Sequence, residues 1–273
     1  MSRAQPPRPA RPAEPAPGPR RAPGQRAPVV EVRGVCFAYD GERVLHDITL
    51  TVAAGDFLGI IGPNGSGKTT FVKIVVGLLR PQCGTVRLFG TALPRFRQWH
   101  RVGYVPQRVA SLEARFPATV AEVVQSGRAA RAGVGRSFSP ADRRAVDWAL
   151  EMVGLADLRD RPIGTLSAGQ QQRAFIARAM ASEPELLVLD EPLVGVDADA
   201  QARFYALLRH LHRDLGVTLI MVSHDVGVIA SEVTTLACLN GILVYHGAPA
   251  AFLESDALRA LYHTGVRVVS HVH

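Results

Sequence analysis

The chain has 273 residues, of which 47% are hydrophobic and 20% charged, so it can bury the core of one large α/β domain or two modest ones. This composition excludes a peptide hormone and a fully disordered regulator. The formal net charge is +7, but the first 28 residues, with six arginines and one acid, supply five of those charges, so the remainder gives no reason to expect a nucleic acid partner.

The N-terminal segment and the cysteines limit the setting of the protein. Residues 1–28 hold nine of the 19 prolines, and we expect them to form a disordered Pro/Arg-rich tail. Cys36, Cys83 and Cys238 are far apart, odd in number and show no CxxC spacing, which predicts neither a disulfide framework nor a cysteine zinc site and favours a reducing, cytosolic setting. No run approaches the roughly 18 apolar residues of a membrane span, so we expect any membrane role to come through a partner.

The first half of the folded part has strand patterns followed by helical ones. The expected strands are 29–39, 48–52, 56–61, 85–89 and 102–105, and the expected helices are 68–79, 120–126 and 140–153. A Gly/Arg-rich stretch at 127–136 is expected to be a loop between the last two helices. The change of character after Gln107 predicts a helical insertion in an α/β domain.

The second half alternates between helix and strand. The expected order is helix 169–181, strand 186–190, helix 198–215, strand 218–222, helix 226–233, a hairpin over 235–246 and a short helix from Pro249. Such alternation is typical of a parallel sheet with crossover helices, so the sequence predicts the α/β class.

A phosphate-binding loop follows the third expected strand. Gly62-Pro-Asn-Gly-Ser-Gly-Lys68-Thr69 fits the GxxxxGK[ST] pattern and directly precedes an expected helix. Its backbone N–H groups would surround a β-phosphate, Lys68 would reach the β and γ oxygens, and the Thr69 hydroxyl would ligate Mg²⁺. The residues expected to bind nucleotide here are Gly62, Pro63, Asn64, Gly65, Ser66, Gly67, Lys68, Thr69 and Thr70.

Two acids end an apolar run about 120 residues after this loop. In Leu186-Leu-Val-Leu-Asp190-Glu191 they would stand at the carboxyl edge of a buried strand, where open α/β sheets bind ligands. An isolated pair of this kind is usually just the start of a helix, but the phosphate loop upstream favours a catalytic pair. Asp190 would hold Mg²⁺ through water, and Glu191 would polarise the water that attacks the γ-phosphate.

Leu166-Ser167-Ala168-Gly169-Gln170 lies between these two motifs, and the set, in this order, resembles the ABC transporter ATPases over residues 29–255. The resemblance implies a P-loop NTPase fold with a mixed core sheet, an antiparallel β subdomain and a helical signature subdomain at about residues 108–180. Residues 256–273 would be a C-terminal extension. Ser167, Gly169 and Gln170 open a helix, so they could bind the γ-phosphate of an ATP held by another subunit.

Further residues match elements of this family one by one. Tyr39 resembles the aromatic residue that stacks on adenine, and Gln107 resembles the glutamine that senses Mg²⁺ and the attacking water. His224 resembles the switch histidine at the γ-phosphate, and Asp197 the aspartate that couples the two sites of a dimer. The resemblance therefore implies Glu191, His224 and Gln107 as catalytic residues, with Thr69, Gln107 and Asp190 around the Mg²⁺ of Mg-ATP.

Two departures from the family pattern have local consequences. Ala168 replaces the usual second glycine of the signature, which would cost about 1 to 2 kcal/mol only if the backbone there were left-handed. Leu193 and Val194 stand where threonine and serine are more usual, so hydroxyl donors near the expected dimer seam are missing. This change bears on coupling between subunits rather than on activity itself.

Within the family, residues 116–128 and the segments 237–240 and 245–247 resemble the zinc and manganese uptake subgroup. That resemblance implies an ATP-hydrolysing motor subunit at the cytoplasmic face of the membrane. It would act as a homodimer with an integral membrane permease, and indirectly with an extracytoplasmic metal-binding protein.

Other hypotheses remain at this stage. One alternative is an importer for iron or an iron chelate. A second is a soluble ABC ATPase acting on nucleic acid or the ribosome, which would usually carry two ATPase cassettes or a long coiled coil, whereas this sequence has one phosphate loop and no sustained heptads. A P-loop kinase or GTPase would leave the signature and His224 unexplained. His271 and His273 form an HxH pair that falls short of a stable zinc site, and His210 and His212 are expected on different sides of a helix.

Overall fold

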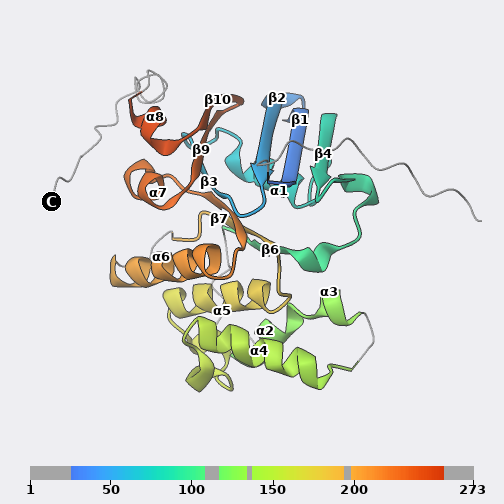
Figure 1. Ribbon diagram of the computed structural model, residues 1–273. Helices are drawn as coiled ribbons and strands as arrows, with labels where there is room; N and C mark the ends of the chain where they lie inside the picture. The colour runs from blue at the N-terminus through green and yellow to red at the C-terminus, as the bar shows by residue number, and fades with distance from the viewer. Residues whose placement is uncertain (1–25, 108–116, 134–136, 194–197, 255–273) are drawn as a thin grey trace, which may run out of the picture.

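The computed structural model describes residues 26–107, 117–133, 137–193 and 198–254, which contain two sheets and a layer of helices (Figure 1). The first sheet has strands β1 (Pro28–Tyr39), β2 (Glu42–Ala53), β4 (Cys83–Leu88) and β5 (Thr91–Ala92). It is antiparallel, in the order β2-β1-β4-β5. The antiparallel β subdomain implied by the resemblance is therefore present.

The second sheet carries the core of the molecule. Its strands are β3 (Phe57–Ile61), β6 (Val102–Val105), β7 (Leu186–Asp190), β8 (Thr218–Val222), β9 (Thr235–Asn240) and β10 (Ile242–Gly247). They lie in the order β10-β9-β3-β8-β7-β6, and all are parallel except β10, so this is the expected mixed sheet. Every residue of β3, β7 and β8 is buried, because helices cover both faces of a parallel sheet.

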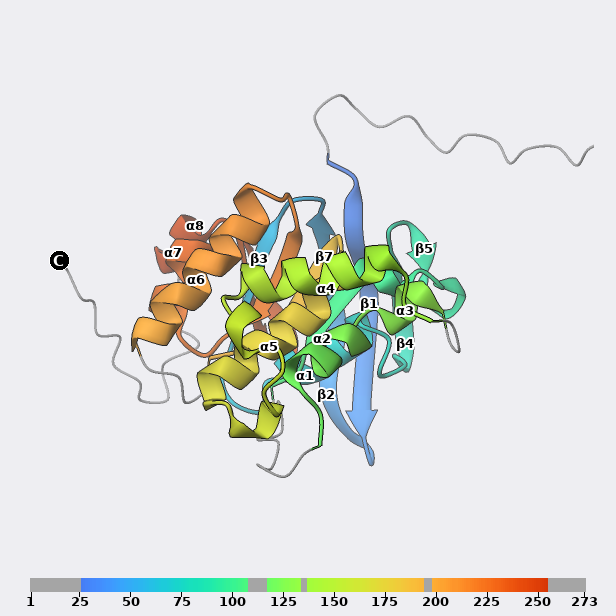
Figure 2. The ribbon, with the colours of Figure 1, turned by 90° about the horizontal axis from the view of Figure 1, so that it is seen from below.

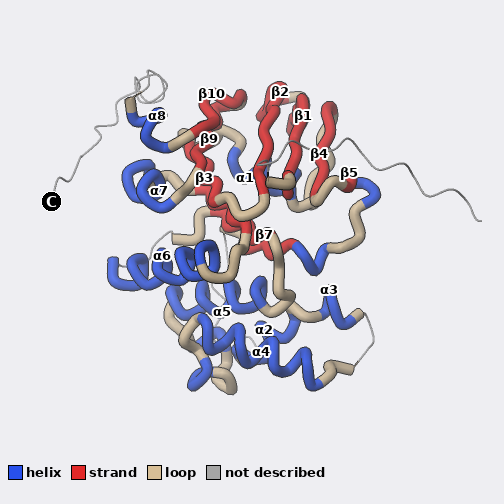
Figure 3. Tube along the Cα trace, in the orientation of Figure 1, coloured by secondary structure: helices blue, strands red, loops and turns tan. Residues whose placement is uncertain are grey.

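The helices divide into those against the sheets and those of the insertion (Figures 2 and 3). They are α1 (Lys68–Val75), α2 (Val120–Ser126), α3 (Ala129–Ala132), α4 (Pro140–Met152), α5 (Ala168–Met180), α6 (Ala198–Arg213), α7 (Val226–Glu232) and α8 (Pro249–Leu253), with 3₁₀ turns at Leu93–Arg95, Trp99–Arg101, Ala156–Leu158 and Ile163–Thr165. Helix α1 packs in a cluster with the antiparallel sheet, while α2, α4, α5 and α6 share the other buried cluster. Among the described residues, no helix has the length and apolar character to cross a membrane.

The insertion is a compact helical unit in which local hydrogen bonds fix where two of the helices begin. Helices α2 and α4 both begin with a capping box, formed by Thr119 with Glu122 and by Ser139 with Asp142. Helices α2 and α5 approach so closely that a Cβ on Gly127 would lie 1.9 Å from the carbonyl oxygen of Arg178. A glycine is therefore required at this crossing for steric reasons.

Several sequence predictions of element ends are wrong. Strand β2 begins at Glu42 rather than at residue 48, and helix α1 ends at Val75 rather than at residue 79. The helix stops because Gly77 adopts a φ of +76°, which turns the backbone N–H groups of residues 78 and 79 back onto the carbonyl of Lys73. The expected loop at 127–136 contains helix α3. Most of the expected tail and all of the expected C-terminal extension lie outside the described residues.

The cysteine spacing predicted no disulfide framework, but one disulfide is present among the described residues. Cys36 on β1 and Cys83 on β4 are directly paired across the antiparallel sheet, with their Cα atoms 5.1 Å apart, and form a disulfide. This Cα separation lies in the usual range for a disulfide. Only the register of β1 against β4 brings together two cysteines that are 47 residues apart. Cys238 is free and buried.

We expect a Cys83→Ser variant of the oxidised protein to be about 4 kcal/mol less stable, because a disulfide that joins residues 47 positions apart restricts the unfolded chain. Urea unfolding with and without reductant measures this. The reductant should lower the stability of the wild type to that of the variant and leave the variant unchanged. An equal response of both proteins to the reductant would contradict a stabilising role for this disulfide.

Candidate functional site

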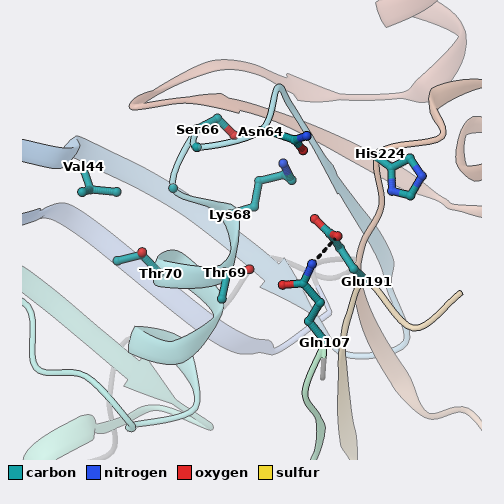
Figure 4. Close-up of a pocket in the computed structure, with 11 residues that line it drawn as sticks. Val44, Asn64, Ser66, Lys68, Thr69, Thr70, Gln107, Glu191 and His224 are labelled. Atoms are coloured by element: carbon teal, nitrogen blue, oxygen red, sulfur yellow. Dashed lines mark hydrogen bonds between the residues drawn. The ribbon is translucent and has the colours of Figure 1, made fainter. Parts of the chain in front are cut away.

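A cavity of about 560 Å³ lies at the carboxyl edge of the six-stranded sheet (Figure 4). It is lined by Val44, Asn64, Gly65, Ser66, Gly67, Lys68, Thr69, Thr70, Gln107, Glu191 and His224. The phosphate loop follows strand β3, and His224 follows β8. Glu191 follows β7, and Gln107 follows β6, and these four strands are neighbours in the sheet. Because these strands are parallel, their carboxyl ends meet, and four segments far apart in sequence converge on one cavity.

The phosphate loop is held by backbone geometry that requires glycine. Gly62 has a φ of +150°, and a Cβ there would lie 2.0 Å from the carbonyl oxygen of Leu239. Gly67, at +91°, directly precedes α1. The Lys68 ammonium donates hydrogen bonds of 2.9 Å to the carbonyls of Gly62 and Pro63. Burial lowers the pKa of Lys68, and the neighbouring carboxylates Glu191 and Asp190 oppose that shift.

Thr69 and Asp190 form a pair of oxygen donors beside the loop. The Thr69 hydroxyl donates to Asp190 Oδ1 at 3.1 Å. Asp190 is 1% exposed, and burial raises its pKa, while the hydrogen bond from Thr69 acts in the opposite direction. Asp190 Oδ2 and Ser66 Oγ are buried and have no hydrogen-bond partner among the described residues. Unpaired hard oxygen atoms beside a phosphate loop fit the ligand preference of Mg²⁺.

Glu191 lies between Gln107 and His224 in Figure 4. The Gln107 amide donates to Glu191 Oε2 at 2.7 Å, which orients the carboxylate. The backbone of Glu191 is left-handed, with a φ of +46°, and its N–H donates to the carbonyl of Val222 at 3.2 Å. Such a conformation is uncommon for a glutamate and is held here by the surrounding structure. A carboxylate oriented at the mouth of a phosphate cavity can accept a proton from an attacking water.

The signature residues line a second cavity of about 400 Å³, with Ser167, Ala168, Gly169, Gln170, Gln172, Arg173, Leu193, Ala200, Arg203 and Phe204 around it. Ser167 is the N-cap of α5 and forms a capping box with Gln170, with hydrogen bonds of 3.3 and 3.0 Å. Ala168 lies within α5 and is not left-handed, so the backbone cost considered above does not arise. The two cavities share no lining residue.

Other candidate residues lie elsewhere. Tyr39 is at the end of β1, is 44% exposed and makes a T-shaped ring contact with Phe37, and it does not line the first cavity. Val44 lines that cavity instead, and no sequence motif pointed to it. Asp197, Val194, His271 and His273 lie outside the described residues.

The two helical histidines face different sides of α6, as predicted. His210 contacts Asp214 at 2.6 Å, and the ring of His212 lies 5.7 Å from that of Phe57.

Residues 45–194 match the family model described as ABC transporter. The sequence is 43% identical, over 81% of this chain and 86% of the relative, to the zinc uptake system ATP-binding protein ZurA of Listeria innocua. It is 42% identical, over 72% of this chain and 84% of the relative, to the high-affinity zinc uptake system ATP-binding protein ZnuC of Bacillus subtilis. It is 37% identical, over 86% of this chain and 92% of the relative, to the manganese transport system ATP-binding protein MntB of Halalkalibacterium halodurans.

Solved structures agree in fold. A putative metal-chelate type ABC transporter in an inward-facing conformation matches with a TM-score of 0.76 and 28% identity, over 86% of this chain and 89% of that chain. The ADP conformation of MJ1267, an ATP-binding cassette of an ABC transporter, matches with a TM-score of 0.75 and 22% identity, over 88% of this chain and 99% of that chain. At 22% identity, the match to MJ1267 supports a shared fold only.

Proposed function

Because this chain belongs to the ABC transporter family, we propose that it is the ATP-hydrolysing subunit of an importer for zinc or manganese. The observation that best supports ATPase activity is that the phosphate loop, Glu191, Gln107 and His224 all line one cavity. The zinc and manganese relatives support the nature of the cargo.

Hydrolysis follows from the groups in this cavity. The loop amides and Lys68 bind the β and γ oxygens of ATP. Glu191, oriented by Gln107, takes a proton from the water that attacks the γ-phosphate, and His224 contacts that phosphate from the next strand. Thr69 and Asp190 would hold Mg²⁺, which neutralises charge on the β- and γ-phosphates when it is bound.

A second copy of the chain completes the site. The phosphate loop and the signature line different cavities, so the signature of one chain serves a nucleotide held by another. Two copies associate head to tail, with ATP between residues 62–70 of one chain and Ser167, Gly169 and Gln170 of the other. The positive end of α5 and the cavity arginines Arg173 and Arg203 suit the charge of a γ-phosphate.

Transport needs partners that this chain does not supply. The relatives are named as ATP-binding proteins of uptake or transport systems, which supports a separate integral membrane permease. The chain would bind that permease at the cytoplasmic face of the membrane, and an extracytoplasmic protein would deliver the metal. ATP-driven closure of the dimer is then transmitted to the permease through the helical insertion.

The test is elemental analysis of cells that lack this protein, grown in metal-depleted medium and complemented with wild type or with Lys68→Ala. We expect cellular zinc or manganese to fall severalfold and only the wild type to restore it, because Lys68 binds the phosphates. The two complementing proteins must be present at equal levels, as measured by immunoblotting.

The pattern of metals decides between the hypotheses. A selective loss of iron would replace the proposed cargo by iron or an iron chelate. Unchanged contents of all metals would contradict metal uptake, while purified protein that hydrolyses ATP would still be an ABC ATPase. Hydrolysis stimulated by nucleic acid would instead favour a soluble, non-transport role.

A further inference from the structure

Two buried polar atoms on neighbouring strands lack a hydrogen-bond partner among the described residues: the hydroxyl of Tyr104 on β6 and Oδ2 of Asp190 on β7. The strands pair in parallel with Tyr104 opposite Val188. Asp190 is two residues beyond Val188, so the side chains of Tyr104 and Asp190 project from the same face of the sheet. This is the face covered by α1, where Val188 is buried and Tyr104 packs against the same cluster.

The two groups are close enough to influence each other. Burial and then the charge of Asp190 raise the pKa of Tyr104 to about 12, so the phenol keeps its proton near neutral pH. The phenol is a donor, whereas Oδ2 of the carboxylate is an acceptor. They do not bond directly, since neither has a partner within hydrogen-bond distance. One water between a donor and an acceptor of this kind satisfies both at little cost.

A purely structural role does not account for the hydroxyl. The aromatic ring packs against the apolar cluster that contains Val188 and Ile220, and a phenylalanine would fill that space equally well. Burying a hydroxyl without a partner carries a free-energy penalty. Oδ1 of Asp190 already accepts a hydrogen bond from the Thr69 hydroxyl at 3.1 Å, so Oδ2 is the acceptor that remains, and its second lone pair stays available toward the Mg²⁺ of Mg-ATP.

We propose that Tyr104 is a positioning residue for Asp190: through one bridging water its hydroxyl holds Oδ2, which keeps the carboxylate in the rotamer that presents it, with Thr69, to the Mg²⁺ of Mg-ATP. This inference rests on the proposed ATPase function and adds a residue to that site. Outer groups of this kind orient metal-binding carboxylates, and their loss typically weakens metal affinity by about 10- to 100-fold. Because a water intervenes here, we expect the lower end of that range.

The test compares Tyr104→Phe with wild type in the Mg²⁺ dependence of binding of a fluorescent, non-hydrolysable ATP analogue. We expect the Mg²⁺ concentration for half-maximal binding to rise about 10-fold, while binding of the analogue without Mg²⁺ and the melting temperature stay unchanged. The matched control is Tyr245→Phe, which removes a hydroxyl that donates to the carbonyl of Ala248, near α8. This control should leave the Mg²⁺ dependence at the wild-type value.

A double variant separates positioning from packing. If Tyr104 acts through Asp190, adding Tyr104→Phe to Asp190→Asn should change the Mg²⁺ dependence no further. An unchanged Mg²⁺ dependence in Tyr104→Phe, or the same 10-fold rise in the Asp190→Asn background, would overturn the inference. Wild-type protein that binds no ATP analogue at any Mg²⁺ concentration would instead overturn the proposed function, and the inference with it.

Discussion

A Glu191→Gln variant should bind ATP nearly as well as wild type but hydrolyse it about 10³-fold more slowly, because an amide cannot accept the proton of the attacking water. That loss corresponds to about 4 kcal/mol of transition-state stabilisation. The substitution keeps the size of the side chain, so the phosphate loop and the Lys68 contacts with the carbonyls of Gly62 and Pro63 are unaffected. Steady-state phosphate release and equilibrium ATP binding are the two measurements.

Glu185→Gln is the matched control for this substitution. Glu185 is paired with Arg101, is 58% exposed and does not line either cavity described above, so we expect unchanged hydrolysis. Retention of hydrolysis within a few-fold of wild type in Glu191→Gln would show that another group accepts the proton. Loss of both ATP binding and hydrolysis would instead assign Glu191 to nucleotide binding.

An Arg128→Ala variant should be less stable than wild type by about 4 kcal/mol, because removing one partner of a buried ion pair leaves the other charge unpaired. Arg128 is only 5% exposed. Its guanidinium donates to Asp142 Oδ1, to the carbonyl of Ala181 and to Glu183 Oε2, each at 2.9 Å, so it joins the end of α2 to the start of α4 and the end of α5. Denaturant unfolding followed by circular dichroism measures the change.

Arg131→Ala is the control that isolates burial. Arg131 contacts the same Glu183 oxygen at the same distance, 2.9 Å, but its side chain is 45% exposed. Exposed ion pairs typically contribute about 0.2 to 1 kcal/mol, so this variant should change stability little. Equal losses in the two arginine variants would contradict the role assigned to burial.

The stability difference between wild type and Arg128→Ala should become smaller at acidic pH. Hydrogen bonds from the hydroxyl of Ser139, from its backbone N–H and then from Arg128 together lower the pKa of Asp142 to about 2. A lowered pKa in the folded state stabilises the fold above the ordinary value of 3.8, and this stabilisation disappears as the pH falls toward 2. The difference between wild type and Arg128→Ala should therefore be constant near neutral pH and shrink below about pH 4.

Much of the site was predictable because short sequence motifs specify the residues that carry its chemistry. The phosphate loop needs glycine at positions where the backbone is left-handed or closely approached, as Gly62 and Gly67 are, so the pattern itself carries the geometry. The apolar runs before Gly62 and Glu191 predicted buried parallel strands. Parallel strands bring their carboxyl ends together, and for that reason residues far apart in sequence were expected in one cavity.

The remaining features depend on contacts between distant segments. The disulfide between Cys36 and Cys83 follows from the antiparallel register of β1 and β4, which the spacing of cysteines does not reveal. Val44 lines the nucleotide cavity because β2 passes beside the phosphate loop, and the early end of α1 depends on how Gly77 turns the chain.

By itself, therefore, the sequence determined the α/β class, the nucleotide motifs and the order in which they occur, because local pattern and backbone conformation encode them. Only the tertiary structure decided which side chains meet across strands and helices: Cys36 with Cys83, Arg128 with Asp142, and Tyr104 on the same face as Asp190. The physical reason is that strand register and helix crossing are set by the packing of the whole core, and no single segment of the chain contains that information.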